Sequence, residues 1–219
     1  MTLESIKSRL LKTKKRGAAL IPMALVMLVV FMVILNYIYR INVLQYNYED
    51  IDTALTDSLL AAAIVNLDEL GESGTVMIQE DAAYPSPSDP YFLNSYAAFL
   101  KCLRINLALD DGFNVTKQRG MKGQVRVKEY RVYNYIETDE GFYVTETGIT
   151  GGNGYSVTHG INEAVYVKAN DGTVEITETS VYAKIEFRLV LSGKVPWTET
   201  GDDACEKDAV LTRLIAVAH

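Results

Sequence analysis

Residues 18–35, AALIPMALVMLVVFMVIL, contain no charged side chain and directly follow a group of basic residues. About 18 residues at a rise of 1.5 Å form roughly 27 Å of helix, which matches the ~30 Å hydrocarbon thickness of a bilayer. The next residues, 36–40 (NYIYR), are of the polar and aromatic kind found at membrane interfaces. We therefore predict a transmembrane helix over residues 18–39.

The basic residues near this segment lie on its N-terminal side, and after Arg40 the next Lys or Arg is Lys101. This asymmetry predicts a cytoplasmic N-terminus and an extracytoplasmic C-terminal domain, so we expect a single-pass protein of the cell membrane. The chain has a net charge of −7, and because residues 1–17 carry +5, the remainder carries −12. Such an acidic domain argues against a nucleic-acid partner.

A cleaved secretory signal peptide is the other explanation for an N-terminal apolar segment. It requires a shorter apolar core followed by small residues at the cleavage site. Residues 36–41 (NYIYRI) contain no such pattern. We therefore expect the helix to remain in the mature protein.

The junction KRGAAL, where basic residues meet Gly17 and the apolar helix begins at once, resembles the processing site of type IV prepilins. It is similar in particular to the TadE-like pseudopilins of tight-adherence (Flp-type) pilus systems and of related Gram-positive secretion or conjugation machines. The similarity covers about residues 12–63. It implies cleavage by a prepilin peptidase between Gly17 and Ala18. The basic residues of the implied leader, residues 1–17, are Lys12, Lys14, Lys15 and Arg16.

The resemblance also implies partners: other pilin-like subunits, the prepilin peptidase, and a pilus assembly platform with its ATPase. Type IV pilins usually carry Glu five residues into the mature chain, and this position is Pro22 here. In the family this Glu is thought to neutralise the terminal ammonium of a neighbouring subunit, an interaction that a low dielectric strengthens. The altered position favours a minor pilin or pseudopilin over a major pilin, and leaves open that the leader is never cut.

Beyond the membrane the apolar residues continue at helical spacing. The pattern predicts that residues 40–70 form a soluble continuation of the helix, which ends near Leu70 at Gly71. Two helices separated near residues 42–48 are the alternative. The apolar positions of the continuation are Ile51, Ala54, Leu55, Ser58, Leu59, Ala62 and Val65.

Residues 71–219 are predicted to form a single extracytoplasmic α+β domain. Residues 75–80 alternate like a short strand, and Asp89 followed by Pro90 is typical of the start of a second helix, expected to reach about residue 109. We expect its apolar face to contain Tyr96, Leu100, Leu103 and Leu107.

Several later segments alternate as strands do. Asp139-Glu140-Gly141 predicts the turn of a hairpin, and Ala169-Asn170-Asp171-Gly172 that of a second one, whereas GITGGNG at residues 148–154 predicts an exposed loop. We expect an antiparallel sheet packed on both helices, a fold that is pilin-like in class. The predicted strands are residues 125–136, 142–147, 165–168, 173–176, 181–191 and 209–218.

Cys102 and Cys205 both fall in the predicted extracytoplasmic region, where disulfides persist. Either they pair and join the second helix to the segment before the last strand, or they are two separate thiols. A weak calcium candidate is a group of closely spaced acids without EF-hand spacing. Its residues are Asp202, Asp203, Glu206 and Asp208.

No catalytic motif, cofactor motif or His-Cys metal set is present in the sequence, so we expect neither an enzyme nor a bound cofactor. The sequence favours a minor pilin or pseudopilin-like subunit of a type IV or Tad-type pilus, secretion or conjugation apparatus. The expected location of such a subunit is the cell membrane before assembly and an extracellular filament after it. The alternative is an uncleaved single-pass surface protein whose ectodomain binds a ligand or a protein.

Overall fold

The structure is a computed structural model, and it describes residues 3–81, 84–117, 120–170, 172–190 and 206–217. Its internal contacts divide the chain into two compact units, Met1–Gln45 and Tyr46–His219. The division falls inside the first helix, so this helix contributes to both units. Each unit is described on its own below.

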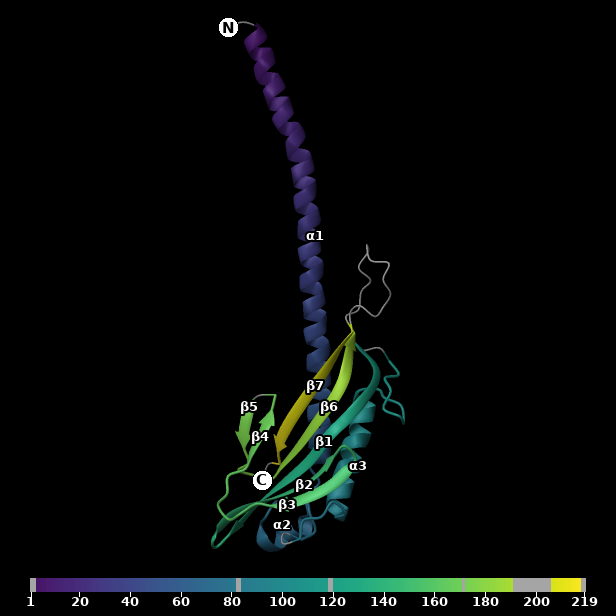
Figure 1. The fold of residues 1–219 in the computed structure, drawn as a ribbon, viewed down its shortest axis with the longest axis vertical. Helices are drawn as coiled ribbons and strands as arrows, with labels where there is room; N and C mark the ends of the chain where they lie inside the picture. The colour runs from purple at the N-terminus through teal and green to yellow at the C-terminus, as the bar shows by residue number, and fades with distance from the viewer. Residues whose placement is uncertain (1–2, 82–83, 118–119, 171, 191–205, 218–219) are drawn as a thin grey trace. The chain divides into compact units, whose positions relative to one another are not determined.

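Helix α1 (Leu3–Ala62) is one unbroken helix of 60 residues (Figure 1). It runs through residues 42–48, so the prediction of a continuous helix is confirmed there and the two-helix alternative is wrong. In the first unit, α1 is the only element among the described residues. In the second unit, its last turns bury Ile51, Leu55, Leu59 and Ala62, as the helical spacing predicted.

The end of α1 differs from the prediction, because the helix stops at Ala62 rather than near Leu70. Asn66 redirects the chain: its N–H donates to Met77 O at 2.9 Å and its amide donates to Gln79 O at 3.1 Å. Its side-chain oxygen also accepts the Asp68 N–H at the start of a separate short helix, α2 (Leu67–Ser73). Gly71 therefore lies inside α2 and does not end α1.

Helix α3 (Pro90–Asn106) begins as the sequence predicted. Asp89 caps it by accepting the N–H groups of Tyr91 at 2.8 Å and Phe92 at 3.2 Å, and Pro90 occupies the first turn. The helix ends earlier than residue 109, since Ala108 has a left-handed backbone with φ of 51°. Its buried residues are Phe92, Ser95, Phe99 and Leu103. Of the predicted apolar face, Leu103 and Leu107 are buried, whereas Tyr96 and Leu100 are only half-buried.

The described residues contain a five-stranded antiparallel sheet in the order β3-β2-β1-β6-β7 and a two-stranded sheet of β4 and β5. Both predicted hairpin turns are confirmed, and the long central strand β1 pairs with β2 on one side and with β6 on the other (Figure 1). The strands are β1 (Met121–Thr138), β2 (Gly141–Thr150), β3 (Asn153–Thr158), β4 (Tyr166–Ala169), β5 (Gly172–Glu175), β6 (Ser180–Val190) and β7 (Glu206–Ala216).

The predicted loop over residues 148–154 is wrong. Its first residues complete β2, its last residues start β3, and only Gly151 and Gly152 form the turn, with φ values of 58° and 87°. The glycine-rich composition suggested flexibility, but two left-handed residues are what a tight hairpin turn requires. The segment is therefore a β-hairpin with an exposed tip.

One face of the large sheet packs on the helices. Tyr130 of β1 is fully buried there, with its ring centroid 5.9 Å from Phe92, 5.1 Å from Tyr96 and 5.0 Å from Phe99. The Tyr130 hydroxyl lies 2.5 Å from Ser95 Oγ, and Ser95 Oγ in turn donates to the carbonyl of Ala62. This hydrogen-bonded chain joins β1, α3 and the end of α1, so it fixes the helices on the sheet.

Residues 75–80 do not form the predicted strand. Residues 76–79 are buried, and side chains of the sheet satisfy their backbone. Asn134 Oδ1 accepts the Ile78 N–H at 2.6 Å, and Thr179 Oγ1 donates to the Val76 carbonyl at 2.5 Å. The Gln79 side chain also accepts hydrogen bonds from Asn134 and from Thr145 of β2. The segment crosses the sheet instead of joining its edge.

The opposite face of the sheet carries alternate residues of β1, including Tyr133. Here the β4–β5 hairpin contributes Val165, Val167 and Ile176 to a second apolar cluster that contains Tyr133 and Tyr182. The side chain of Asn170, between β4 and β5, accepts the Thr212 N–H at 3.3 Å, which holds the hairpin against the edge strand β7. The rest of this face carries polar and charged side chains.

Candidate functional site

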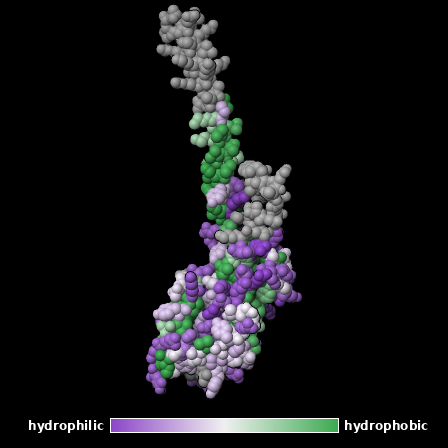
Figure 2. Space-filling view, in the orientation of Figure 1, coloured by the Kyte–Doolittle hydropathy of each residue, from purple (hydrophilic) through white to green (hydrophobic). Residues whose placement is uncertain are grey.

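The first candidate is the apolar part of α1. Residues 21–39 are all exposed, among them Phe31 at 60% and Leu25 at 61%. Figure 2 shows this part as a predominantly apolar surface with a few weakly polar patches. Among the described residues, α1 is the one helix long and apolar enough to cross a membrane by length and composition. This N-terminal helix is thus a candidate membrane-spanning segment.

The residues of the expected processing site lie in the same helix. Gly17 and Ala18 have helical backbone, as do the basic residues of the leader before them, Lys12, Lys14, Lys15 and Arg16. Pro22 lies inside the helix and is exposed. Proline provides no N–H, so the Ala18 carbonyl, four residues earlier, receives no helical hydrogen bond from position 22.

The second candidate is a network of charged residues on the sheet face opposite the helices, which we call the polar sheet face. It consists of Glu129, Arg131, Glu146, Tyr155, His159 and Lys184. Antiparallel register places these side chains together, because Arg131 lies opposite Gly148, and Gly148 lies opposite Tyr155. Residues from four strands, β1, β2, β3 and β6, and from the loop that follows β3 meet there.

Arg131 is the centre of this network. Its guanidinium donates to Glu129 Oε2 at 2.5 Å, to Glu146 Oε1 at 3.3 Å and to the Tyr133 hydroxyl at 3.3 Å. It also lies over the ring of Tyr182, with 5.5 Å between Cζ and the ring centroid. Four side chains, two carboxylates and two tyrosines, contact this guanidinium, so it is fixed in position.

The two carboxylates are each bound from a second side. Lys184 Nζ donates to Glu129 Oε1 at 3.0 Å, and the Tyr155 hydroxyl donates to Glu146 Oε1 at 2.5 Å. His159 Nε2 lies 3.6 Å from Glu146 Oε2, an ion pair only when the histidine is protonated. Two negative and two positive charges therefore balance within the network.

Burial and neighbouring charge shift the pKa values of these groups. Burial raises the pKa of the Tyr155 phenol, and its hydrogen bond to Glu146 and the charge of that residue raise it further. Burial also raises the pKa of Tyr133, with Glu146 adding to the effect. Burial acts to raise the pKa of Glu129, but the hydrogen bonds and charges of Lys184 and Arg131 outweigh it, so this pKa lies below its usual value.

The side chains of this network bind one another, and none of them is placed as a reactive group. None of the network residues is a Ser or Cys nucleophile, and both carboxylates are engaged by cations or hydroxyls. Within the described part of the chain, no group of His, Cys, Asp and Glu is arranged to hold a metal ion. The polar sheet face is therefore a charge-balanced surface, and a ligand there would have to displace existing ion pairs.

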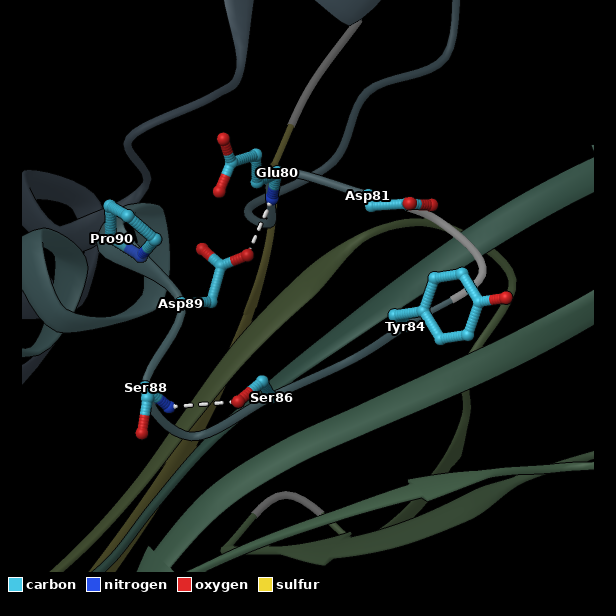
Figure 3. A pocket seen from close by; sticks show the side chains of 7 residues that line it. All are labelled: Glu80, Asp81, Tyr84, Ser86, Ser88, Asp89 and Pro90. Atoms are coloured by element: carbon cyan, nitrogen blue, oxygen red, sulfur yellow. Dashed lines mark hydrogen bonds between the residues drawn. The ribbon is translucent and has the colours of Figure 1, made fainter.

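The third candidate is an open hollow of about 600 Å³ near the start of α3. Figure 3 shows the Asp89 carboxylate directed toward the Glu80 backbone N–H, which it accepts at 2.6 Å, while Tyr84 lies apart on the far side of the hollow. Since the other Asp89 oxygen caps α3, both oxygens already serve the backbone. The lining residues are Glu80, Asp81, Tyr84, Ser86, Ser88, Asp89 and Pro90.

Of the two cysteines, Cys102 lies in the described part of the chain. Cys102 lies half-buried on α3, where its Sγ lies 3.9 Å from the Asp57 carbonyl and 3.4 Å from the Asn106 amide nitrogen. Cys205 lies outside the described residues. The disulfide therefore stays a prediction.

The calcium candidate is also largely outside the described part of the chain, which excludes Asp202, Asp203 and the side chain of Glu206. The remaining acid, Asp208 on β7, accepts from Arg188 Nε at 3.0 Å in an exposed ion pair. This single acid pairs with a cation of β6. The calcium site therefore stays a prediction.

Sequence reasoning did not find the polar sheet face. Its residues were visible only as polar positions that alternate with apolar ones along predicted strands. The register across β1, β2 and β3 was required to show that Arg131, Glu146 and Tyr155 are neighbours. The one local signal was Gly148, since a glycine inside a strand often marks the close approach of another group.

We compared the chain with models of protein families, with curated proteins and with solved structures, and none of them matches it.

Proposed function

We propose that this chain is a non-enzymatic minor pilin or pseudopilin-like subunit of a type IV or Tad-type pilus, secretion or conjugation apparatus. The observation that carries the proposal is the continuity of α1. One helix contains the basic leader, the exposed apolar segment and, from Tyr46, core residues of an α+β unit. A helix of this kind can be stored in a membrane and later packed against copies of itself.

The apolar segment supplies the association in this proposal. Its exposed aliphatic and aromatic side chains are as suited to neighbouring helices as to lipid tails, and helices that leave lipid for a filament gain contacts by close packing. The partners are other pilin-like subunits, a prepilin peptidase and an assembly platform. All of them follow from the resemblance of the N-terminal junction.

Pro22 has a role in this proposal even though it replaces the family Glu. A peptidase requires an accessible, extended peptide, whereas residues 17 and 18 have helical backbone. Because Pro22 leaves the Ala18 carbonyl without its helical donor, it weakens the helix at the bond to be cut. Gly17 adds to this effect, since glycine is a poor helix former.

The deciding experiment determines the intact mass and the N-terminal residue of the protein recovered from membranes with and without a prepilin peptidase. We expect a chain that begins at Ala18 only when the peptidase is present, and no cleavage in a Gly17→Leu variant. Pro22→Ala should slow cleavage, while Met27→Ala, farther along the same exposed surface, should not. A chain that retains its leader in both membranes would contradict the proposal.

That contrary result would favour the second candidate, an uncleaved single-pass protein with a binding ectodomain. The observation in its favour is Pro22 itself, because no acidic residue lies between Ala18 and Tyr48 to neutralise the new N-terminus of a neighbour. The polar sheet face would then be the first surface to examine for a binding partner.

A further inference from the structure

The two edges of the five-stranded sheet differ in how they are protected. At the β7 edge, Asn170 donates its N–H to the Thr212 carbonyl at 3.3 Å, and its side chain accepts the Thr212 N–H at 3.3 Å. The β7 strand also carries charged residues, including Asp208 and Arg213. Covering loops and charges of this kind prevent edge strands from pairing with other chains.

The β3 edge has no charged residue, and in the described part of the chain no backbone hydrogen bond from another element covers it. Pro87 lies on one face of the strand, against Gly154. The strand sequence NGYSVT contains no charged residue and no proline, although the chain as a whole carries a net charge of −7. Its ends are exposed, with Val157 at 44%. An uncharged, exposed edge is the type of strand that accepts another strand.

The register identifies the backbone groups that are available. The His159 N–H donates to the Val144 carbonyl at 2.9 Å, and the same hydrogen-bonded side of the ladder includes Val157 with Glu146 and Tyr155 with Gly148. The N–H and C=O groups of Gly154, Ser156 and Thr158 consequently point away from β2. In the described part of the chain, no hydrogen bond from another element reaches these groups.

We propose that β3 pairs with β3 of a second copy of this chain, antiparallel and with Ser156 on the two-fold axis. In this register Ser156 lies opposite itself, and Gly154 lies opposite Thr158 of the partner copy. The outward N–H and C=O groups of all three residues then find partners. The two five-stranded sheets form one continuous sheet.

The side chains of β3 favour a second copy over an unrelated strand. On the face that carries the polar network, Tyr155 lies opposite the exposed Val157 of the other copy, and the reverse pair forms across the axis. Aromatic and β-branched residues are favourable cross-strand neighbours. On the other face, Ser156 meets Ser156, and Thr158 meets Gly154, against which Pro87 of the same copy packs. No like charges oppose each other. The strand is thus complementary to itself.

A charge-swap experiment at Ser156 tests this pairing in the full chain in detergent. Either Ser156→Lys or Ser156→Glu places like charges on the two-fold axis and should weaken the dimer about five-fold or more, as measured by sedimentation. An equimolar mixture of the two variants should restore a dimer that contains one copy of each. Val174→Lys on the exposed strand β5 is the matched control and should dimerise as the wild type does.

Several results would overturn the proposal: a monomeric wild type at every concentration, an unweakened Ser156→Lys dimer, or no recovery in the mixture. A misfolded variant is recognised by its melting temperature, and it would not recover on mixing. Association through α1 gives a dimer that is insensitive to position 156, which also counts against β3 pairing. The proposal does not depend on pilin function, because leader cleavage is measured separately and can succeed or fail on its own.

Discussion

The ring of Tyr155 lies against Gly148 on the neighbouring strand, and only a glycine leaves room for it. A Cβ built on Gly148 would lie 2.8 Å from both Cζ and the hydroxyl oxygen of Tyr155. In this position the Tyr155 hydroxyl reaches Glu146 Oε1 at 2.5 Å. The missing side chain in β2 therefore allows a side chain of β3 to complete the polar network around Arg131.

This relationship predicts a coupled effect of two substitutions. Gly148→Ala should displace the ring and its hydrogen bond to Glu146, and Tyr155→Phe should remove that hydrogen bond directly. Each should lower the free energy of unfolding by about 1–2 kcal/mol, because the acceptor is a charged group in a partly buried site. The double variant should lose less unfolding free energy than the two single variants lose together, because both substitutions remove the same hydrogen bond. Thermal unfolding followed by circular dichroism measures this cycle, with the exposed Tyr166→Phe as the control that should change nothing.

A second prediction concerns the ion pair between Asp52 of α1 and Arg213 of β7. Arg213 Nε donates to Asp52 Oδ1 at 2.6 Å, its Nη2 binds the other carboxylate oxygen, and both side chains are largely buried. Asp52→Asn should destabilise the Tyr46–His219 unit by about 1–3 kcal/mol, because a bidentate charged contact is lost and Arg213 remains. The exposed pair Arg188–Asp208 offers a matched control: Asp208→Asn should cost less than about 1 kcal/mol in the same chemical denaturation.

A third prediction is a loss of stability at alkaline pH. Burial raises the pKa of Tyr130, Tyr133 and Tyr155 above the ordinary value of 10. Above pH 10 the unfolded chain releases these protons while the folded chain retains them, so stability should be complete below pH 10 and should fall as pH rises beyond it. Absorbance of tyrosinate near 295 nm should show these groups titrating only on unfolding, and a titration identical in folded and denatured protein would contradict this.

A fourth prediction concerns the stability of the fold at acidic pH, which should depend on Glu129. Lys184 and Arg131 lower the pKa of this residue in the folded state. A lowered pKa contributes stability above the unfolded value of 4.5, and this stability is lost as pH falls through the folded pKa. Glu129→Gln should therefore reduce the difference in melting temperature between pH 7 and pH 3. Glu175→Gln on the exposed strand β5 should leave that difference unchanged.

A fifth prediction separates the structural role of Asp89 from ligand binding in the hollow. Asp89 caps α3 and accepts the Glu80 N–H, so Asp89→Ala should destabilise the protein by about 1–2 kcal/mol. Ser86→Ala, which removes only a local contact to the Ser88 N–H, should cost much less. If the hollow held a divalent cation through Asp89, calcium would raise the melting temperature of the wild type but not of the variant. We expect no calcium effect that depends on Asp89.

The local sequence pattern was sufficient to predict those elements that are formed by interactions between residues close together in the chain. The apolar run predicted a helix, Asp89-Pro90 predicted the start of α3, and Asp139-Glu140-Gly141 predicted the turn between β1 and β2. In each case the interaction that forms the element joins residues a few positions apart, so the sequence contains both partners within one window.

The remaining features depend on partners that are distant in the chain. Asn66 ends α1 because Met77 and Gln79 bind it, and residues 76–79 cross the sheet because Asn134 and Thr179 satisfy their backbone. Propensity favoured a longer helix and a strand at these places, but buried backbone groups must find hydrogen bonds, and only folding brought these side chains to them. The polar sheet face arose in the same way. Each of its residues was an ordinary polar position in the sequence, and the register of four strands, β3, β2, β1 and β6, made them neighbours.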